Sequence, residues 1–227
     1  MSAPAVPESP VHSRNIGFNL GVIVLVMAFI GLGVAYGIDA LSRAHATSGH
    51  RGDDSTTLTR TIGGRDLEIP LSWFRYDEQR VEGFAKQVDL HFVLPLGPEG
   101  AQRDIEVTLL PRSSVRPSSH LLDGVYLHMF DAAQLDGPPG LVGKPLKPAE
   151  GYRGEAVWYD ALSVDPFVAK CGTPVRAEAP SRCLRAVHLA PGIAAIYAFD
   201  ADVLDNWREF DPQVRGLLSR IGVFGAS

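Results

Sequence analysis

The sequence predicts an N-terminal transmembrane helix followed by one α+β domain, which has a mainly antiparallel sheet and a C-terminal amphipathic helix. Three observations lead to this fold class. Residues 16–38 contain no charged side chain. Several later segments alternate apolar and polar residues, as half-buried strands do. Near the C-terminus, Val214, Leu217, Leu218 and Ile221 follow the i, i+3, i+4, i+7 spacing of a helix with one buried face.

The apolar segment 16–38 is long enough to span a membrane. As a helix it would be about 35 Å long, and the hydrocarbon core of a bilayer is about 30 Å thick. A cleaved signal peptide is the alternative, because Ala44, His45 and Ala46 form a small-x-small triplet that a signal peptidase could accept. Apolar cores of signal peptides are shorter, about 7–15 residues, so we expect a retained anchor.

This anchor divides the chain into a cytoplasmic tail (1–15), the transmembrane helix (16–38), a tether (39–54) and an exported domain (55–227). The tether is polar, contains Gly and Ser, and lacks periodicity. The basic residues that flank the anchor do not settle its orientation under the positive-inside rule. We place the domain outside the cytoplasm because the tail is short and because the domain contains a cysteine pair suited to an oxidising compartment.

A stripe of small residues runs along one side of the predicted transmembrane helix. Its members are Gly17, Gly21, Ala28, Gly31 and Ala35. Such a stripe lets two helix backbones approach closely, which suggests self-association or docking onto a partner membrane helix. The alternative is that glycine is simply frequent in membrane helices, since Gly33 and Gly37 lie on the opposite side.

The first strands of the domain form a predicted hairpin. Residues 56–62 and 65–71 flank Gly63 and Gly64, which supply the positive φ angles of a two-residue turn. The other expected strands show either apolar alternation or a short apolar run. They are 87–95, 103–111, 154–161, 183–189 and 192–199.

Two helices and one irregular segment complete the predicted domain. Residues 118–130 approximate a helical face that Ser118 or Ser119 could cap. Residues 134–154 are rich in glycine and proline and predict a long irregular crossing. The terminal helix is expected to begin at Asp211-Pro212, with the carboxylate as cap and proline at the first helical position.

Cys171 and Cys183 are the only cysteines in the chain. In an exported domain we expect them to form a disulfide that closes a loop between two strands. A redox-active dithiol is an alternative, but such pairs usually have Cys-x-x-Cys spacing. A metal site is a weaker alternative, because the nearest histidine, His188, lies in an apolar strand and two thiolates need further ligands.

The sequence contains no known catalytic or cofactor motif. The HExxH motif, Gly-x-Ser-x-Gly and a glycine-rich phosphate loop are all missing. We therefore predict no catalytic residue, no cofactor and no metal. Asp202 and Asp205 could do acid–base chemistry, but a helix start also favours carboxylates there. Nucleic acid is not an expected partner, because the chain has 21 basic and 26 acidic residues and a net charge of −5.

Six motifs of the domain resemble those of an uncharacterised group of alphaproteobacterial proteins that have one membrane span and an exported domain. The motifs are GRDLEIPLSWFR (64–75), VDLHFVLP (88–95), GYRGEAVWYDA (151–161), PFVAKC (166–171), RCLRAVHL (182–189) and DNWREFDPQVRGLL (205–218). The resemblance covers most of the chain after Ser55. It implies the bacterial inner membrane, with the C-terminal domain in the periplasm and the cysteine pair intact, and it implies no activity.

The sequence leaves three functional hypotheses. We expect an envelope protein that contacts the lipid bilayer through residues 16–38 and whose domain binds another protein or an envelope component. The first alternative is an anchored enzyme with a noncanonical site, using His91 or His120 as base and residues 134–154 as a lid. The second is a ligand sensor that relays a signal through a partner helix.

Overall fold

The computed structural model describes residues 56–148, 151, 153–173 and 180–225. The predicted transmembrane segment 16–38 and its small-residue stripe lie outside these ranges, as do the predicted tail and tether. Among the residues that are described, no helix combines the length and the apolar character that crossing a bilayer would require.

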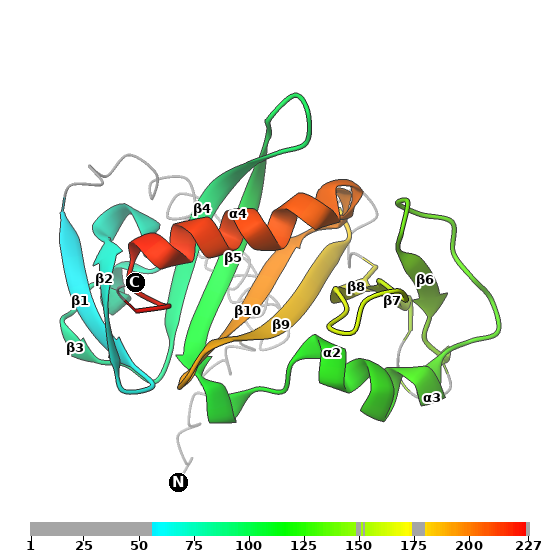
Figure 1. Cartoon of the computed structure of the whole chain (residues 1–227), viewed down its shortest axis with the longest axis horizontal. Helices are drawn as coiled ribbons and strands as arrows, with labels where there is room; N and C mark the ends of the chain where they lie inside the picture. The colour runs from blue at the N-terminus through cyan, green and yellow to red at the C-terminus, as the bar shows by residue number, and fades with distance from the viewer. Residues whose placement is uncertain (1–55, 149–150, 152, 174–179, 226–227) are drawn as a thin grey trace, which may run out of the picture. The chain divides into compact units, whose positions relative to one another are not determined.

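The described chain is an α+β domain with a mainly antiparallel sheet and a C-terminal helix, as the sequence predicts (Figure 1). The main sheet has seven strands in the order β4-β5-β10-β9-β8-β7-β6, and all neighbours are antiparallel. Its strands are β4 (Val88–Leu96), β5 (Ala101–Pro111), β6 (Val142–Pro145), β7 (Glu155–Tyr159), β8 (Val168–Gly172), β9 (Arg182–Ala190) and β10 (Ile193–Asp200).

A smaller sheet has the order β2-β1-β3. It contains the predicted first hairpin, since β1 (Thr57–Ile62) and β2 (Arg65–Pro70) pair in antiparallel register. Gly63 and Gly64 make the turn with φ of 57° and 79°, angles that residues with a Cβ rarely adopt. The two-residue strand β3 (Gly83–Phe84) lies parallel to β1.

Helix α4 (Trp207–Arg220) covers one face of the main sheet (Figure 1). Its buried residues Phe210, Val214 and Leu218 belong to the main hydrophobic core. The Phe210 ring lies 4.8 Å from the Phe199 ring and 5.6 Å from the Tyr197 ring, measured between centroids. Packing of the apolar face of α4 on β10 therefore joins the helix to the sheet.

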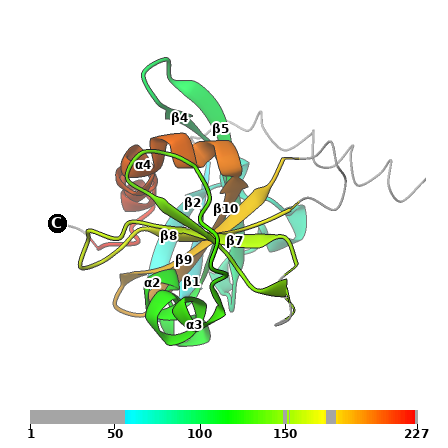
Figure 2. The same ribbon diagram turned by 90° about the vertical axis from the view of Figure 1, so that its right-hand side faces the viewer.

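The second helical region lies beside β7 and β8, on the opposite side from α4 (Figure 2). It consists of α2 (Ser118–Leu121), the π-helical turn η4 (Leu122–Tyr126) and α3 (Leu127–Met129), which confirms the helix predicted over 118–130. These residues pack on β7 and β8 in a separate small cluster. Its buried members are Leu122, Tyr126, Leu146, Val157 and Val168.

Short 3-10 turns complete the described elements. They are η1 (Leu71–Trp73), η2 (Asp77–Gln79), η3 (Arg112–Ser114) and η6 (Ala201–Asn206).

Three local predictions are wrong. Helix α4 begins at Trp207, so Pro212 lies inside it and Asp211 is not its cap. Phe210 is buried against Phe199 and Tyr197 of β10, so the helix begins one turn before the start that Asp211 and Pro212 predict. No side chain caps α2; Ser118 Oγ instead accepts a hydrogen bond from the backbone N–H of Ala186, at 2.9 Å.

The segment 134–154 is also not irregular throughout, because it contains β6. The Trp158 ring lies against Gly137 and Gly143, where an added Cβ would come within 2.1 Å and 2.4 Å of ring atoms. Two of the glycines that suggested a loop are therefore needed for close packing of β6 and its neighbouring segment on β7.

Candidate binding groove

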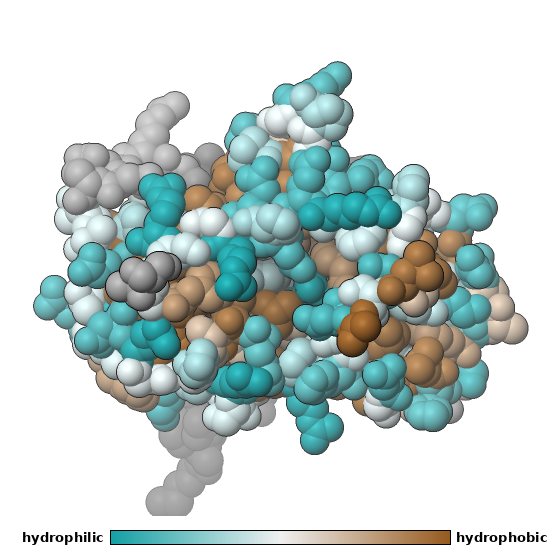
Figure 3. Space-filling view, in the orientation of Figure 1, coloured by the Kyte–Doolittle hydropathy of each residue, from teal (hydrophilic) through white to brown (hydrophobic). Residues whose placement is uncertain are grey.

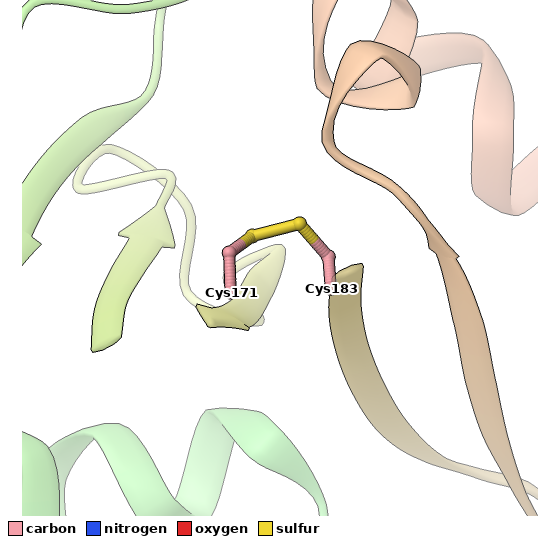
Figure 4. Close-up of a disulfide and its surroundings, with 2 residues drawn as sticks. All are labelled: Cys171 and Cys183. Atoms are coloured by element: carbon pink, nitrogen blue, oxygen red, sulfur yellow. A yellow bond between two sulfur atoms is a disulfide. The ribbon is translucent and has the colours of Figure 1, made fainter. Parts of the chain in front are cut away.

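Cys171 and Cys183 form the predicted disulfide (Figure 4). The two cysteines are opposite each other on β8 and β9, with Cα atoms 4.0 Å apart. Both are buried in the main core. Because β8 and β9 pair at only three positions, the covalent bond reinforces the narrowest junction of the sheet. The sulfurs are therefore structural rather than part of an open redox site.

A second link across this region joins β9 to α4. The guanidinium of buried Arg185 donates two hydrogen bonds to the Asp211 carboxylate, of 2.6 Å and 3.1 Å, and lies 4.4 Å from the centre of the Phe167 ring. Burial raises the pKa of the nearby Tyr197 phenol above its ordinary value, and the Asp211 carboxylate adds to this effect. Asp211, predicted as a helix cap, thus anchors the helix to the sheet instead.

An open groove of about 680 Å³ lies between β4 and α4. Residues 93–95 of β4 form one wall, and the other is formed by Arg208, Glu209, Pro212, Gln213, Gly216 and Leu217. We call it the β4–α4 groove. Its helical residues repeat every four positions from 208 to 216, so at 1.5 Å per residue the groove follows the helix for about 12 Å. The β4–β5 hairpin projects beyond α4 and supplies the strand wall (Figure 1).

Gly216 and Pro212 determine the shape of the helix wall. No atom of the described residues lies within 4 Å of a Cβ placed on Gly216, so the lack of a side chain there leaves the groove open. Pro212 has no N–H, so the Arg208 carbonyl receives no α-helical hydrogen bond from position 212. The groove surface as a whole is mainly apolar, although Arg208, Glu209 and Gln213 also line it.

The charged residues at one end of the groove are already engaged. Glu209 Oε2 accepts a hydrogen bond from the backbone N–H of Gly97, at 3.1 Å. The Arg208 guanidinium donates to the Pro139 carbonyl at 3.2 Å and lies 4.4 Å from the centre of the Trp207 ring. These contacts position the groove wall against the β4–β5 turn and the segment before β6.

Strand β4 is an edge strand of the main sheet, and its outer edge is partly covered. The backbone of Asp89 points outward, because its carbonyl accepts from the N–H of Arg75 and its own N–H donates to Gln79. Backbone direction alternates along a strand, so Val93 also directs its N–H and C=O outward, into the groove region. Pro95, the next outward position, has no N–H to donate.

The residues considered for catalysis lie elsewhere. His91 contacts Asp104 at 3.0 Å on β4 and β5, and the rings of His120 and His188 are 6.5 Å apart beside α2. Asp202 forms an ion pair with Arg103. None of these residues lines the β4–α4 groove, and within the described ranges no three His, Cys, Asp or Glu residues are grouped as metal ligands would be.

Comparisons of the chain with protein-family models, with curated proteins and with solved structures gave no match.

Proposed function

We propose that this protein is a single-span anchor of the bacterial inner membrane whose periplasmic domain binds an extended, apolar segment of another envelope protein in the β4–α4 groove. The uncharged segment 16–38 supports the anchor, because its length matches a bilayer core. The disulfide between Cys171 and Cys183 supports an oxidising compartment such as the periplasm. The small-residue stripe of segment 16–38 would bring two such anchors, or an anchor and a partner helix, together.

The groove is the observation that carries the binding function. It joins the outward backbone of Val93 to a helix wall that includes Pro212, Gly216 and Leu217, so an extended peptide could form main-chain hydrogen bonds on one side and bury apolar side chains on the other. About 12 Å of groove accommodates three to four residues of extended chain at about 3.3 Å per residue. Such a short contact fits a weak or transient complex.

Site-specific photo-crosslinking in intact cells tests this proposal. A photoreactive amino acid at exposed Gln213, in the groove, should give an adduct with a distinct protein, whereas one at exposed Ser219, outside the groove lining, should not. In the same chain Gly216→Trp should remove the Gln213 adduct, because the indole would fill the open space beside Gly216. Identical adducts at the two positions, or a Gln213 adduct unaffected by Gly216→Trp, would contradict the proposal.

A further inference from the structure

Three apolar side chains are exposed on the segment that leads into β3. Tyr76 is 40%, Val81 57% and Phe84 69% exposed. We call these residues the apolar rim. Isolated exposed apolar side chains are common, but here two aromatic rings and a valine are exposed within nine residues of the chain.

Val81 and Phe84 of the rim are held on the small sheet. Gly83 and Phe84 pair with Arg60 and Thr61 of β1, and the N–H of Ala85 donates to the Thr61 carbonyl at 2.9 Å. The buried guanidinium of Arg60 donates to the Val81 carbonyl. These bonds fix the backbone on both sides of the rim, so the side chains of Val81 and Phe84 are presented outward from an ordered segment.

The rim also lies near the point where the N-terminal chain enters the domain. Strand β1 begins at Thr57, and its pairing with β3 starts three residues later, about 10 Å along the strand. The sequence between the proposed anchor and the domain, residues 39–54, is sixteen residues long. A flexible coil of that length spans about 22 Å on average, so the start of β1 would stay close to the bilayer.

We infer that the apolar rim docks on the surface of the lipid bilayer and orients the anchored domain; this inference rests on the proposed membrane anchor. Aromatic side chains favour the interface between lipid headgroups and acyl chains. The segment 75–86 has three basic and three acidic residues, so its net charge does not oppose approach to anionic lipids. Tethering raises the effective concentration of the rim at the bilayer to about the millimolar range, which makes a small apolar contact sufficient.

A second exposed apolar area lies elsewhere on the domain. If it contacted the bilayer, the domain would have a different orientation. Leu162 and Val164 are 95% and 106% exposed in the loop between β7 and β8. Hydrophobic residues gather at this end of the molecule, to the right in Figure 3, whereas β1 and β3 lie at the left in Figure 1. Asp160 and Asp165 flank the loop and would be repelled by anionic lipids. The opposite end, which carries the tether, is the better candidate for the bilayer contact.

Fluorescence quenching by nitroxide-labelled lipids tests this inference on the full chain. The protein is reconstituted in phosphatidylethanolamine–phosphatidylglycerol vesicles with one fluorophore, attached at Glu82→Cys, next to Val81 of the rim, or at Ser163→Cys in the β7–β8 loop. Labelling is specific because the two native cysteines are bonded to each other. We expect several-fold stronger quenching at position 82 than at 163, and loss of the difference in the Val81→Ser/Phe84→Ser variant, whose fold is checked by circular dichroism.

Two outcomes would overturn the inference while leaving the anchor intact. One is weak quenching at position 82 in protein that stays in the vesicles after an alkaline carbonate wash. The other is quenching at position 163 equal to or greater than that at 82. Release of the protein by the wash would instead contradict the proposed anchor itself, so the two failures can be told apart.

Discussion

The two ends of the main sheet are held together by different means. At the wide end, strands β4, β5, β10 and β9 pair over seven to nine positions each and bury one face against α4. At the narrow end, β8 meets β9 at three positions, and β6 to β8 pack with α2 and α3 in a small cluster, while Ala169 and Cys171 of β8 also reach the main core. The disulfide and the Arg185–Asp211 pair lie close to this junction.

The difference shows how a small hydrophobic cluster can be kept ordered. The five buried residues of the small cluster offset only part of the conformational entropy of these short strands, because each ordered backbone residue costs about 1–2 kcal/mol. A covalent bond lowers this cost by restricting the unfolded chain. We therefore expect the wide end to set the global stability and the narrow end to depend on the disulfide.

The largest expected effect comes from truncation at the centre of the wide end. Phe210 is fully buried and contacts the rings of Phe199, Tyr197 and Phe167. Phe210→Ala should lower the free energy of unfolding by about 3–5 kcal/mol, because it removes a large side chain and leaves a cavity. Urea denaturation followed by fluorescence measures this change.

Leu146→Ala is the matched substitution at the narrow end. Leu146 is also buried, but in the small cluster, and we expect a loss of about 2 kcal/mol because the loosely supported strands can close around the cavity. Equal losses for Phe210→Ala and Leu146→Ala would show that the two ends form one equally packed core.

The next largest effect is expected from removal of the disulfide. Cys171→Ser/Cys183→Ser should cost about 3 kcal/mol on the loop-entropy model, for a loop with a sequence separation of 12. Hydrogen exchange followed by mass spectrometry should show faster exchange in β6, β7 and β8 than in β4, β5 and β10. Wild-type protein treated with a reductant is the control. Uniform acceleration in all strands would mean that the narrow end does not open separately.

Much of this architecture could be predicted from the sequence because it depends on local patterns of apolar and polar residues. Leu90, Phe92 and Leu94 alternate with polar or exposed positions, and the same period marks β5. The β1–β2 turn was identifiable from two adjacent glycines. The start of α4 was not identifiable in this way. Asp211 and Pro212 predict a later start, but the packing of Phe210 on β10 favours a helix that already includes Phe210.

The groove was not predictable for a different reason. It arises where Val93 and Gly216 come together, although more than a hundred residues separate them in the chain. The sequence features that contribute to it locally are Pro212 and Gly216 in α4. From the sequence alone, both residues only indicate a helix of lower intrinsic stability. A groove forms between elements that are distant in the chain. The periodicity of one element shows which of its faces is apolar but not which other element it will face.

The smallest expected effect is an increase in stability, and it can be tested at each end of the main sheet separately. Gly216 of α4 and Gly124 of the η4 turn both have open space where a Cβ would lie, and neither has a positive φ. Each Gly→Ala substitution should therefore stabilise its own helix by about 0.5–1 kcal/mol, because alanine loses less backbone entropy on folding.

Hydrogen exchange should resolve where each substitution acts. If the ends open independently, Gly216→Ala should slow exchange in α4 and leave α2 and α3 unchanged, and Gly124→Ala should do the reverse. If either substitution slows exchange everywhere by the same factor, the sheet opens as one unit, and the disulfide then stabilises the whole domain rather than its narrow end. Because alanine at position 216 adds only one methyl group to the groove, this substitution should also leave the Gln213 crosslink in place, in contrast to Gly216→Trp.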